Sequence, residues 1–147
     1  KKYPVYPIIK KIECREFGGL NPKKSAGALD FPTVKKERAF PAESGVSKKV
    51  IGHEKSSGIC RDVKSGEFTA VGSLKLPQSA IKGSVGAGDA FCAGCLYGLY
   101  EGFDDKSLLE FASAAAACNL FSENSIDGMK TKNEIIEISN KYKREKL

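Results

Sequence analysis

The chain has 147 residues, of which 41% are hydrophobic and 29% are charged, with 24 basic and 18 acidic side chains. This balance is typical of one globular domain and excludes a disordered chain. No apolar run approaches the roughly 18 residues of a membrane helix, and the first residues lack the apolar stretch of a secretion signal, so we expect neither a spanning segment nor export.

Residues 1–45 have an irregular composition, with five prolines and several lysine pairs. We expect only short elements there, a strand near Ile8–Ile12 and a helix after Val34. Residues 1–50 hold 12 basic and 5 acidic side chains. Such an excess can mark a nucleic-acid surface, but aromatic side chains are not interleaved with the charges. A solvated, loop-rich segment is the preferred interpretation, and nucleic-acid binding is not expected.

Residues 46–82 have the pattern of a small sheet. Short extended runs are predicted at Val46–Gly52, Gly58–Asp62 and Phe68–Val71, with a turn at Lys64–Glu67 between the last two. This spacing predicts antiparallel strands at the edge of a sheet.

Residues 83–147 predict three helices. The first runs from Gly88–Asp89 to Glu101, with Gly102 ending it, and small side chains on one face would let another element approach closely. The second follows Asp104–Asp105 and ends by Asn124. The third runs from Lys132 to Lys143, and its apolar face carries Ile135, Ile138 and Tyr142. The last residues are expected to form a frayed, solvated end.

The five cysteines, at positions 14, 60, 92, 95 and 118, are odd in number and show no repeated spacing. We therefore expect reduced thiols and a cytoplasmic location. Cys92 and Cys95 form a CxxC, for which two small side chains on one helix are preferred over a redox pair. For His53, the only histidine, a structural role is preferred. For Asp104–Asp105, capping of a helix is preferred over binding of a cation.

The segment from Gly83 to Phe91, GSVGAGDAF, carries the clearest chemical signal. Gly86 and Gly88 allow a positive φ and the close approach of a ligand. The first amides of a helix have no partner within it and favour an anion, most often phosphate. The patterns of the P-loop and of the dinucleotide fingerprint are both absent. Asp89 then either takes a proton from an attacking hydroxyl or caps the helix, and the two interpretations stay open.

The longer run GSVGAGDAFCAGCLYGLYEG resembles the C-terminal signature of the ribokinase-like (pfkB) carbohydrate kinase family. The Ala-rich stretch at 111–117 resembles the family's helix on the nucleotide side, and 50–71 resembles its strand–turn–strand. The resemblance implies an α/β fold, the C-terminal portion of a three-layer αβα sandwich. Residues 46–147 would be the nucleotide-binding and catalytic C-terminal half, and the basic residues 1–45 would belong to a truncated domain.

The resemblance also implies an ATP-dependent phosphotransferase that acts on a hydroxyl of a sugar or nucleoside. Asp89 would be the catalytic base, and the amides of Gly86, Ala87 and Gly88 would form an anion hole. Mg²⁺ would accompany the ATP. The remaining implied roles are nucleotide contacts for Gly58 and Ser113 and a metal contact for Glu16.

Three features depart from the family pattern or leave an alternative open. The family's N-terminal half, which carries most sugar contacts, has no recognisable counterpart, so a truncated relative that binds nucleotide or serves a non-catalytic role is the alternative. Gly83 stands where many members have an Asp of a monovalent-cation site. The loop 122–128 either edges the nucleotide pocket or simply joins two helices. The expected partner is a small molecule, with no membrane, and an oligomer is left open.

Overall fold

The computed structural model describes residues 49–147. The strand expected near Ile8–Ile12, the helix expected after Val34 and the metal contact expected of Glu16 lie outside the described residues.

A small antiparallel sheet opens the described part. Strand β1 (Lys49–His53) pairs with β2 (Ser57–Asp62), and β2 pairs with β3 (Phe68–Gly72), in the order β1-β2-β3. Between β2 and β3, the carboxylate of Asp62 accepts hydrogen bonds from the amides of Lys64 and Ser65, and Gly66 takes a φ of +73°. The antiparallel strands and the turn predicted from the sequence are confirmed.

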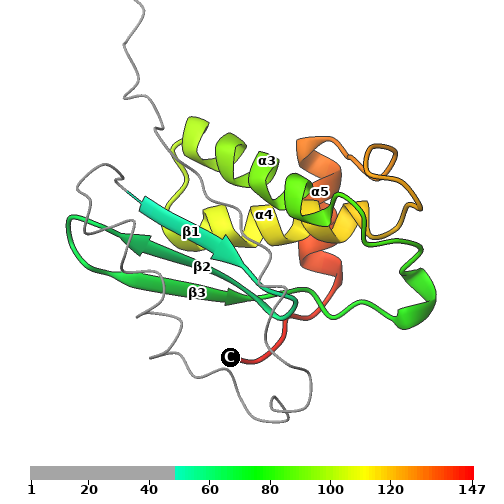
Figure 1. The fold of residues 1–147 in the computed structure, drawn as a ribbon, viewed down its shortest axis with the longest axis horizontal. Coiled ribbons are helices and arrows are strands. Elements are labelled where there is room, and N and C mark those ends of the chain that lie inside the picture. The colour runs from blue at the N-terminus through cyan, green and yellow to red at the C-terminus, as the bar shows by residue number, and fades with distance from the viewer. Residues whose placement is uncertain (1–48) are drawn as a thin grey trace, which may run out of the picture.

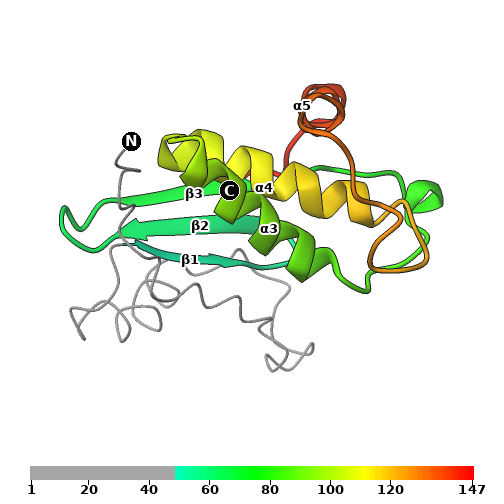
Figure 2. The same ribbon diagram turned by 90° about the horizontal axis from the view of Figure 1, so that it is seen from above.

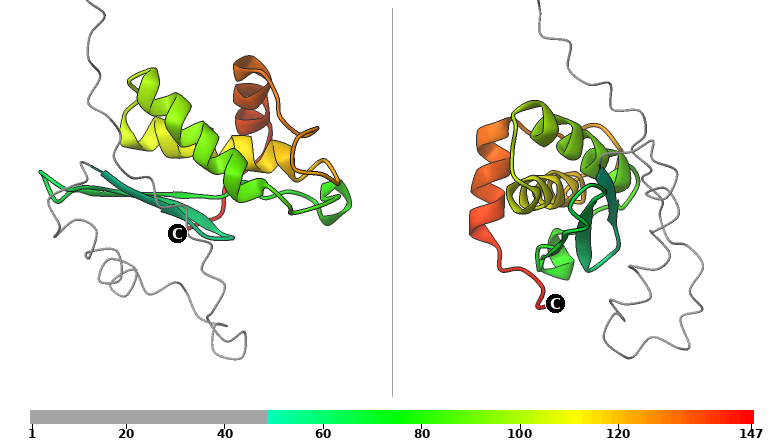
Figure 3. Two further views of the ribbon diagram at one scale, coloured as in Figure 1. Left: turned by 45° about the horizontal axis from the view of Figure 1, so that its top comes forward. Right: turned by 90° about the vertical axis from the view of Figure 1, so that its left-hand side faces the viewer.

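Helices α3 (Ala87–Tyr100), α4 (Asp105–Asn119) and α5 (Lys132–Lys141) follow, after a short 3-10 helix at Gln78–Ala80. Figures 1 and 3 show α3 and α4 lying along one face of the sheet. Helix α4 is central, because it contacts β2 and β3 as well as α3 and α5. Figure 2 shows α5 crossing α4 on the side away from the sheet. The described residues thus form a sheet covered on one face by α3 and α4, with α5 packed outside α4.

Each helix begins as local chemistry dictates. Asp104 caps α4 by accepting a hydrogen bond from the Ser107 amide at 2.7 Å, which confirms the capping role of this residue. Thr131 and Glu134 form a reciprocal capping box at the start of α5. Helix α3 has no side-chain cap, and begins instead at Gly86 in the left-handed conformation.

The core lies between the sheet and α4. Phe91, Leu108 and Leu109 are almost completely buried, and they pack with residues of all three strands. Helices α3 and α4 approach closely at Gly94, where an added Cβ would lie 2.7 Å from the Cα of Ala112. The small face predicted for the first helix therefore serves helix–helix packing.

The C-terminal segment 142–147 contradicts the sequence prediction. It is not frayed, because Arg144 forms an isolated antiparallel bridge with Leu74, and the Glu145 amide donates to the Ser73 carbonyl at 2.8 Å. The guanidinium of Arg144 also donates to the carbonyls of Gly72 and Glu110. Helix α5 ends at Lys141, two residues earlier than predicted, because Tyr142 is already extended.

Candidate functional site: the glycine turn before α3

The turn at Gly86 places the beginning of α3 at the surface. Gly86 has φ +81° and ψ 0°, and its carbonyl accepts the first helical bond, from Ala90 at 2.9 Å. An added Cβ at Gly86 would overlap the side chain of Ser125. Glycine is required here both by the backbone conformation and by the close approach of the loop. Gly88 is not among the residues with positive φ, so that expectation was wrong for Gly88.

The amides at this turn differ in their availability. The Ala87 amide donates to the Ser84 carbonyl at 3.3 Å. Gly88 and Asp89 are the second and third residues of α3, so their amides have no acceptor within the helix. Together with the helix dipole, they give this end a partial positive charge. The side chain of Asp89 is exposed in the same first turn.

Asn119, which the sequence analysis did not single out, binds the turn from the end of α4. It is the last residue of α4 and 0% exposed. Its Nδ2 donates to the carbonyl of Val85 at 2.7 Å, joining the end of α4 to the turn. In the sequence, Asn119 stands out only as one amide side chain in a run of small and apolar residues. That pattern does not indicate that its partner is Val85, 34 residues earlier.

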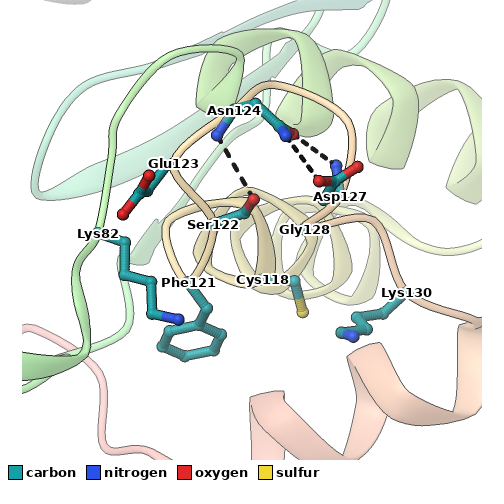
Figure 4. Close-up of a pocket in the computed structure, with 9 residues that line it drawn as sticks. All are labelled: Lys82, Cys118, Phe121, Ser122, Glu123, Asn124, Asp127, Gly128 and Lys130. Carbon is teal, nitrogen blue, oxygen red and sulfur yellow. Dashed lines mark hydrogen bonds between the residues drawn. The ribbon is translucent and has the colours of Figure 1, made fainter.

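A cavity of about 340 Å³ is lined by the loop 122–128, by Cys118 near the end of α4, and by the side chains of Lys82 and Lys130. Figure 4 shows Cys118 between the side chains of Lys82 and Lys130, with the loop residues above them. The loop is held by its own polar groups, since Asn124 donates to Asp127 at 2.6 Å and accepts from the Asp127 amide at 2.8 Å. Burial raises the pKa of the Cys118 thiol to about 11. The loop therefore contacts both the cavity and, through Ser125, the turn.

The two residues expected to contact a nucleotide have packing roles in the structure. Gly58 is buried in β2, and an added Cβ would lie 3.2 Å from the ring of Phe91. Ser113 is 5% exposed on α4, and its hydroxyl has no hydrogen-bond partner within residues 49–147. Neither residue lines the cavity. Their nucleotide contacts stay predictions.

Metal binding by side chains has no candidate among residues 49–147, where no group of three His, Cys, Asp or Glu side chains could hold an ion. Asp105 forms an ion pair with Lys49 at 2.5 Å, beside the capping residue Asp104.

Burial in the core raises the pKa of the Cys60 thiol to about 12. The ring of His53 packs against that of Phe91 in a tilted arrangement, with 4.6 Å between ring centroids.

Among residues 49–147, none of the four cysteines forms a disulfide, and Cys95 is completely buried on α3. Across the same residues, no helix has the length and apolar character needed to cross a membrane.

The glycine turn lies in a segment that matches a known protein family. Residues 63–132, which include the turn and all of α4, match the model of the pfkB family of carbohydrate kinases. The family resemblance is confirmed. The segment of this chain that matches the pfkB family also holds the loop 122–128.

The curated relatives that match this chain are sugar kinases by name. The chain is 37% identical over 86 residues to the 5-dehydro-2-deoxygluconokinase of Geobacillus thermodenitrificans, an alignment of 58% of this chain and 24% of the relative. It is 31% identical over 121 residues to the enzyme of that name from Clostridium botulinum, covering 76% of this chain and 34% of the relative. The chain thus spans only about a quarter to a third of the length of these relatives.

Solved structures show the fold. A ribokinase from Thermotoga maritima aligns with a TM-score of 0.62 at 20% identity, over 73% of this chain and 34% of its own. The 2-dehydro-3-deoxygluconokinase of the same organism aligns with a TM-score of 0.61 at 20% identity, over 79% of this chain and 36% of its own. The described residues therefore adopt part of a ribokinase-like α/β fold, as the sequence predicted.

Proposed function

We propose that this chain provides the nucleotide-binding and catalytic portion of an ATP-dependent kinase that phosphorylates a hydroxyl of a sugar. The observation that carries the proposal is the turn at Gly86, which leads into the exposed start of α3 with Asp89 in the first helical turn. Residues 46–147 form this portion, and residues 1–45 belong to a truncated domain. The names of the curated relatives favour a sugar over a nucleoside.

Each residue at the turn has one task in this mechanism. The carboxylate of Asp89 takes the proton from the acceptor hydroxyl as that hydroxyl attacks phosphorus. The amides of Gly86, Ala87 and Gly88 form the anion hole, which stabilises negative charge on the group being transferred. Since the Ala87 amide already contacts Ser84, the Gly86 and Gly88 amides are its more available members, and the neighbouring Asp89 amide is equally open.

The exposed amides and the helix dipole fit a triphosphate, and bound MgATP would supply the phosphoryl group. A candidate ribokinase II from E. coli has been solved in complex with ATP and Mg²⁺, which supports the same cofactors here. Because residues 49–147 hold no cluster of side chains for a metal, Mg²⁺ would be held mainly through phosphate oxygens. Glu16 remains the proposed protein contact. Nucleotide contacts by Gly58 and Ser113, and a cytoplasmic location, also remain predictions.

A second candidate function is a truncated relative that binds nucleotide without catalysing transfer. It needs only the exposed amides at the start of α3, which can bind phosphate without an acceptor hydroxyl. The two candidates share the anion site and differ in whether a sugar is phosphorylated.

The first prediction concerns Asp89. We expect Asp89→Asn to lower the rate of phosphoryl transfer by about 10²–10⁴-fold, because the amide cannot accept the proton, while MgATP affinity stays within a few-fold. The measurement is ADP release with a panel of keto- and deoxy-sugar acids. Transfer by the variant at the wild-type rate would remove Asp89 from the mechanism. A chain that binds MgATP but transfers nothing to any sugar would favour the second candidate function.

The second prediction concerns the anion site. Gly88→Val places a branched side chain beside the exposed amides, so we expect calorimetry to show at least about tenfold weaker MgATP binding. Ala93→Val is the control, because it places the same valine side chain at an exposed position of α3 away from the turn. Equal affinity of the two variants would contradict the assignment of the anion site.

A further inference from the structure

The bond between Asn119 and Val85 has a geometric consequence for the turn. In a trans peptide unit the C=O and N–H groups point in opposite directions. The Val85 carbonyl and the Gly86 amide belong to one such unit, and the carbonyl points at Nδ2 of Asn119, 2.7 Å away. The Gly86 N–H is therefore directed away from the end of α4, toward the open side of the turn.

Asn119 is an unusual choice for its position if packing alone matters. Its side chain is completely buried, and its Oδ1 accepts no hydrogen bond from the described residues. A buried polar atom without a partner lowers stability, so an apolar side chain of the same size would pack at least as well. Only the amino group can face a carbonyl, which fixes the orientation of the amide. The contact with Val85 is thus what distinguishes Asn119 from leucine here.

The surroundings leave Asn119 little freedom to move. An added Cβ at Gly128 would lie 2.5 Å from the Cα of Asn119, so the loop packs directly on this residue. The Lys82 amide donates to the carbonyl of the next residue, Leu120, at 2.9 Å. Gly83 lies so close to the Ser122 carbonyl that an added Cβ would be 2.9 Å from its oxygen. The end of α4 therefore holds the segment leading to the turn at two places.

We propose that Asn119 is a positioning residue of the anion site. Its amide holds the peptide unit between Val85 and Gly86 so that the Gly86 N–H faces the ligand side. This inference rests on the proposed function, since it assigns Gly86 a role in binding phosphate. The residue acts through the backbone and does not itself contact the ligand.

The test compares Asn119→Leu, which keeps the size of the side chain and removes the donor, with Asn119→Asp, which keeps the shape and leaves only acceptors. Leu108→Val is the control, because Leu108 is also completely buried on α4 but lies near the opposite end of the helix from Asn119. Hydrogen exchange of the amides of residues 83–90 is measured in the free full chain, and MgATP affinity by calorimetry.

We expect both Asn119 variants to exchange these amides about tenfold faster, and to bind MgATP about tenfold more weakly, than the control. Wild-type exchange at residues 83–90 in a folded Asn119→Leu variant overturns the inference, as does wild-type MgATP affinity. If the wild-type chain binds no MgATP, the proposed function fails for this chain, and the exchange measurement still decides whether Asn119 holds the turn. Should the variants not fold, NMR of the wild type decides, since rapid exchange of the Asn119 side-chain amide protons would exclude the bond.

Discussion

Gly86 and Gly66 share a positive φ but differ in what surrounds them. At Gly66, with φ +73°, nothing lies within 4 Å of an added Cβ. At Gly86, with φ +81°, the added atom would overlap Ser125 in a loop that follows α4. The first glycine serves only the backbone of a turn, whereas the second also makes room for a contact between distant segments.

This pair gives the third prediction, on stability. Gly66→Ala should lower the free energy of unfolding by about 1 kcal/mol, from the left-handed conformation alone. Gly86→Ala should lower it by about 3 kcal/mol, because displacement of the loop adds to the same strain. Urea unfolding of the two variants measures the difference. Equal changes in the free energy of unfolding would mean that the loop at Ser125 moves aside without loss of stability.

Single residues also show where sequence reasoning reached its limit. The glycine motif and its use at a helix start could be predicted, because both follow from local conformation. The distinction between Gly86 and Gly88 could not, since either glycine permits a positive φ and only one adopts it. Asn119 was missed because its role depends on a carbonyl from another part of the chain. The burial of Gly58 against Phe91 was hidden for the same reason.

Among the elements, the strands and helices follow from short-range signals in the sequence. Turn residues separate β2 from β3, a capping aspartate begins α4, and Gly102 follows the end of α3 with φ +74°. The segment after α5 followed no such signal. Its lysines and glutamate suggested a solvated end, yet Arg144 donates to carbonyls at Gly72 and Glu110, which are distant in sequence. Every residue has a backbone carbonyl, so the sequence does not indicate which carbonyls accept a bond from Arg144.

The fourth prediction concerns Arg144. Arg144→Ala should lower the free energy of unfolding by about 1–3 kcal/mol, because the carbonyls of Gly72 and Glu110 and the hydroxyl of Ser139 lose a donor. Lys146→Ala, at an exposed neighbouring position, is the control and should leave stability unchanged. Thermal and urea unfolding both report the change. A similar stability of the two variants would show that the segment is not held by the guanidinium.

For the molecule as a whole, several carboxylates are held in their charged form by specific partners. The amide of Ser65 is the main cause that lowers the pKa of Asp62, with Lys49 adding to it. The amide of Ser107 lowers the pKa of Asp104, and the hydroxyl of Thr131 lowers the pKa of Glu134. Turns and caps that the sequence already suggested thus also set how the fold responds to acid.

The fifth prediction is a loss of stability in acid. Because these carboxyl groups bind protons more weakly in the folded chain than in the unfolded chain, their stabilisation is complete above the ordinary pKa values. This stabilisation is lost as the pH falls below about 4 and passes the lowered pKa values that the carboxyl groups have in the folded chain. The urea midpoint of the wild type should fall between pH 6 and pH 3. The midpoint of Asp62→Asn should fall less steeply, because its side chain does not titrate and can still accept the hydrogen bonds of the turn. Identical pH profiles would exclude Asp62 as a contributor.

The bridge between Leu74 and Arg144 also affects how copies of the chain can meet. The carbonyl of Ser73 and the amide of Lys75 are occupied by Glu145 and Lys143, directly beyond the end of β3. Open backbone groups at a sheet border are places where another molecule can add a strand. The segment 142–147 therefore occupies the backbone groups just beyond β3, and loss of this segment would leave them open to a strand of another molecule.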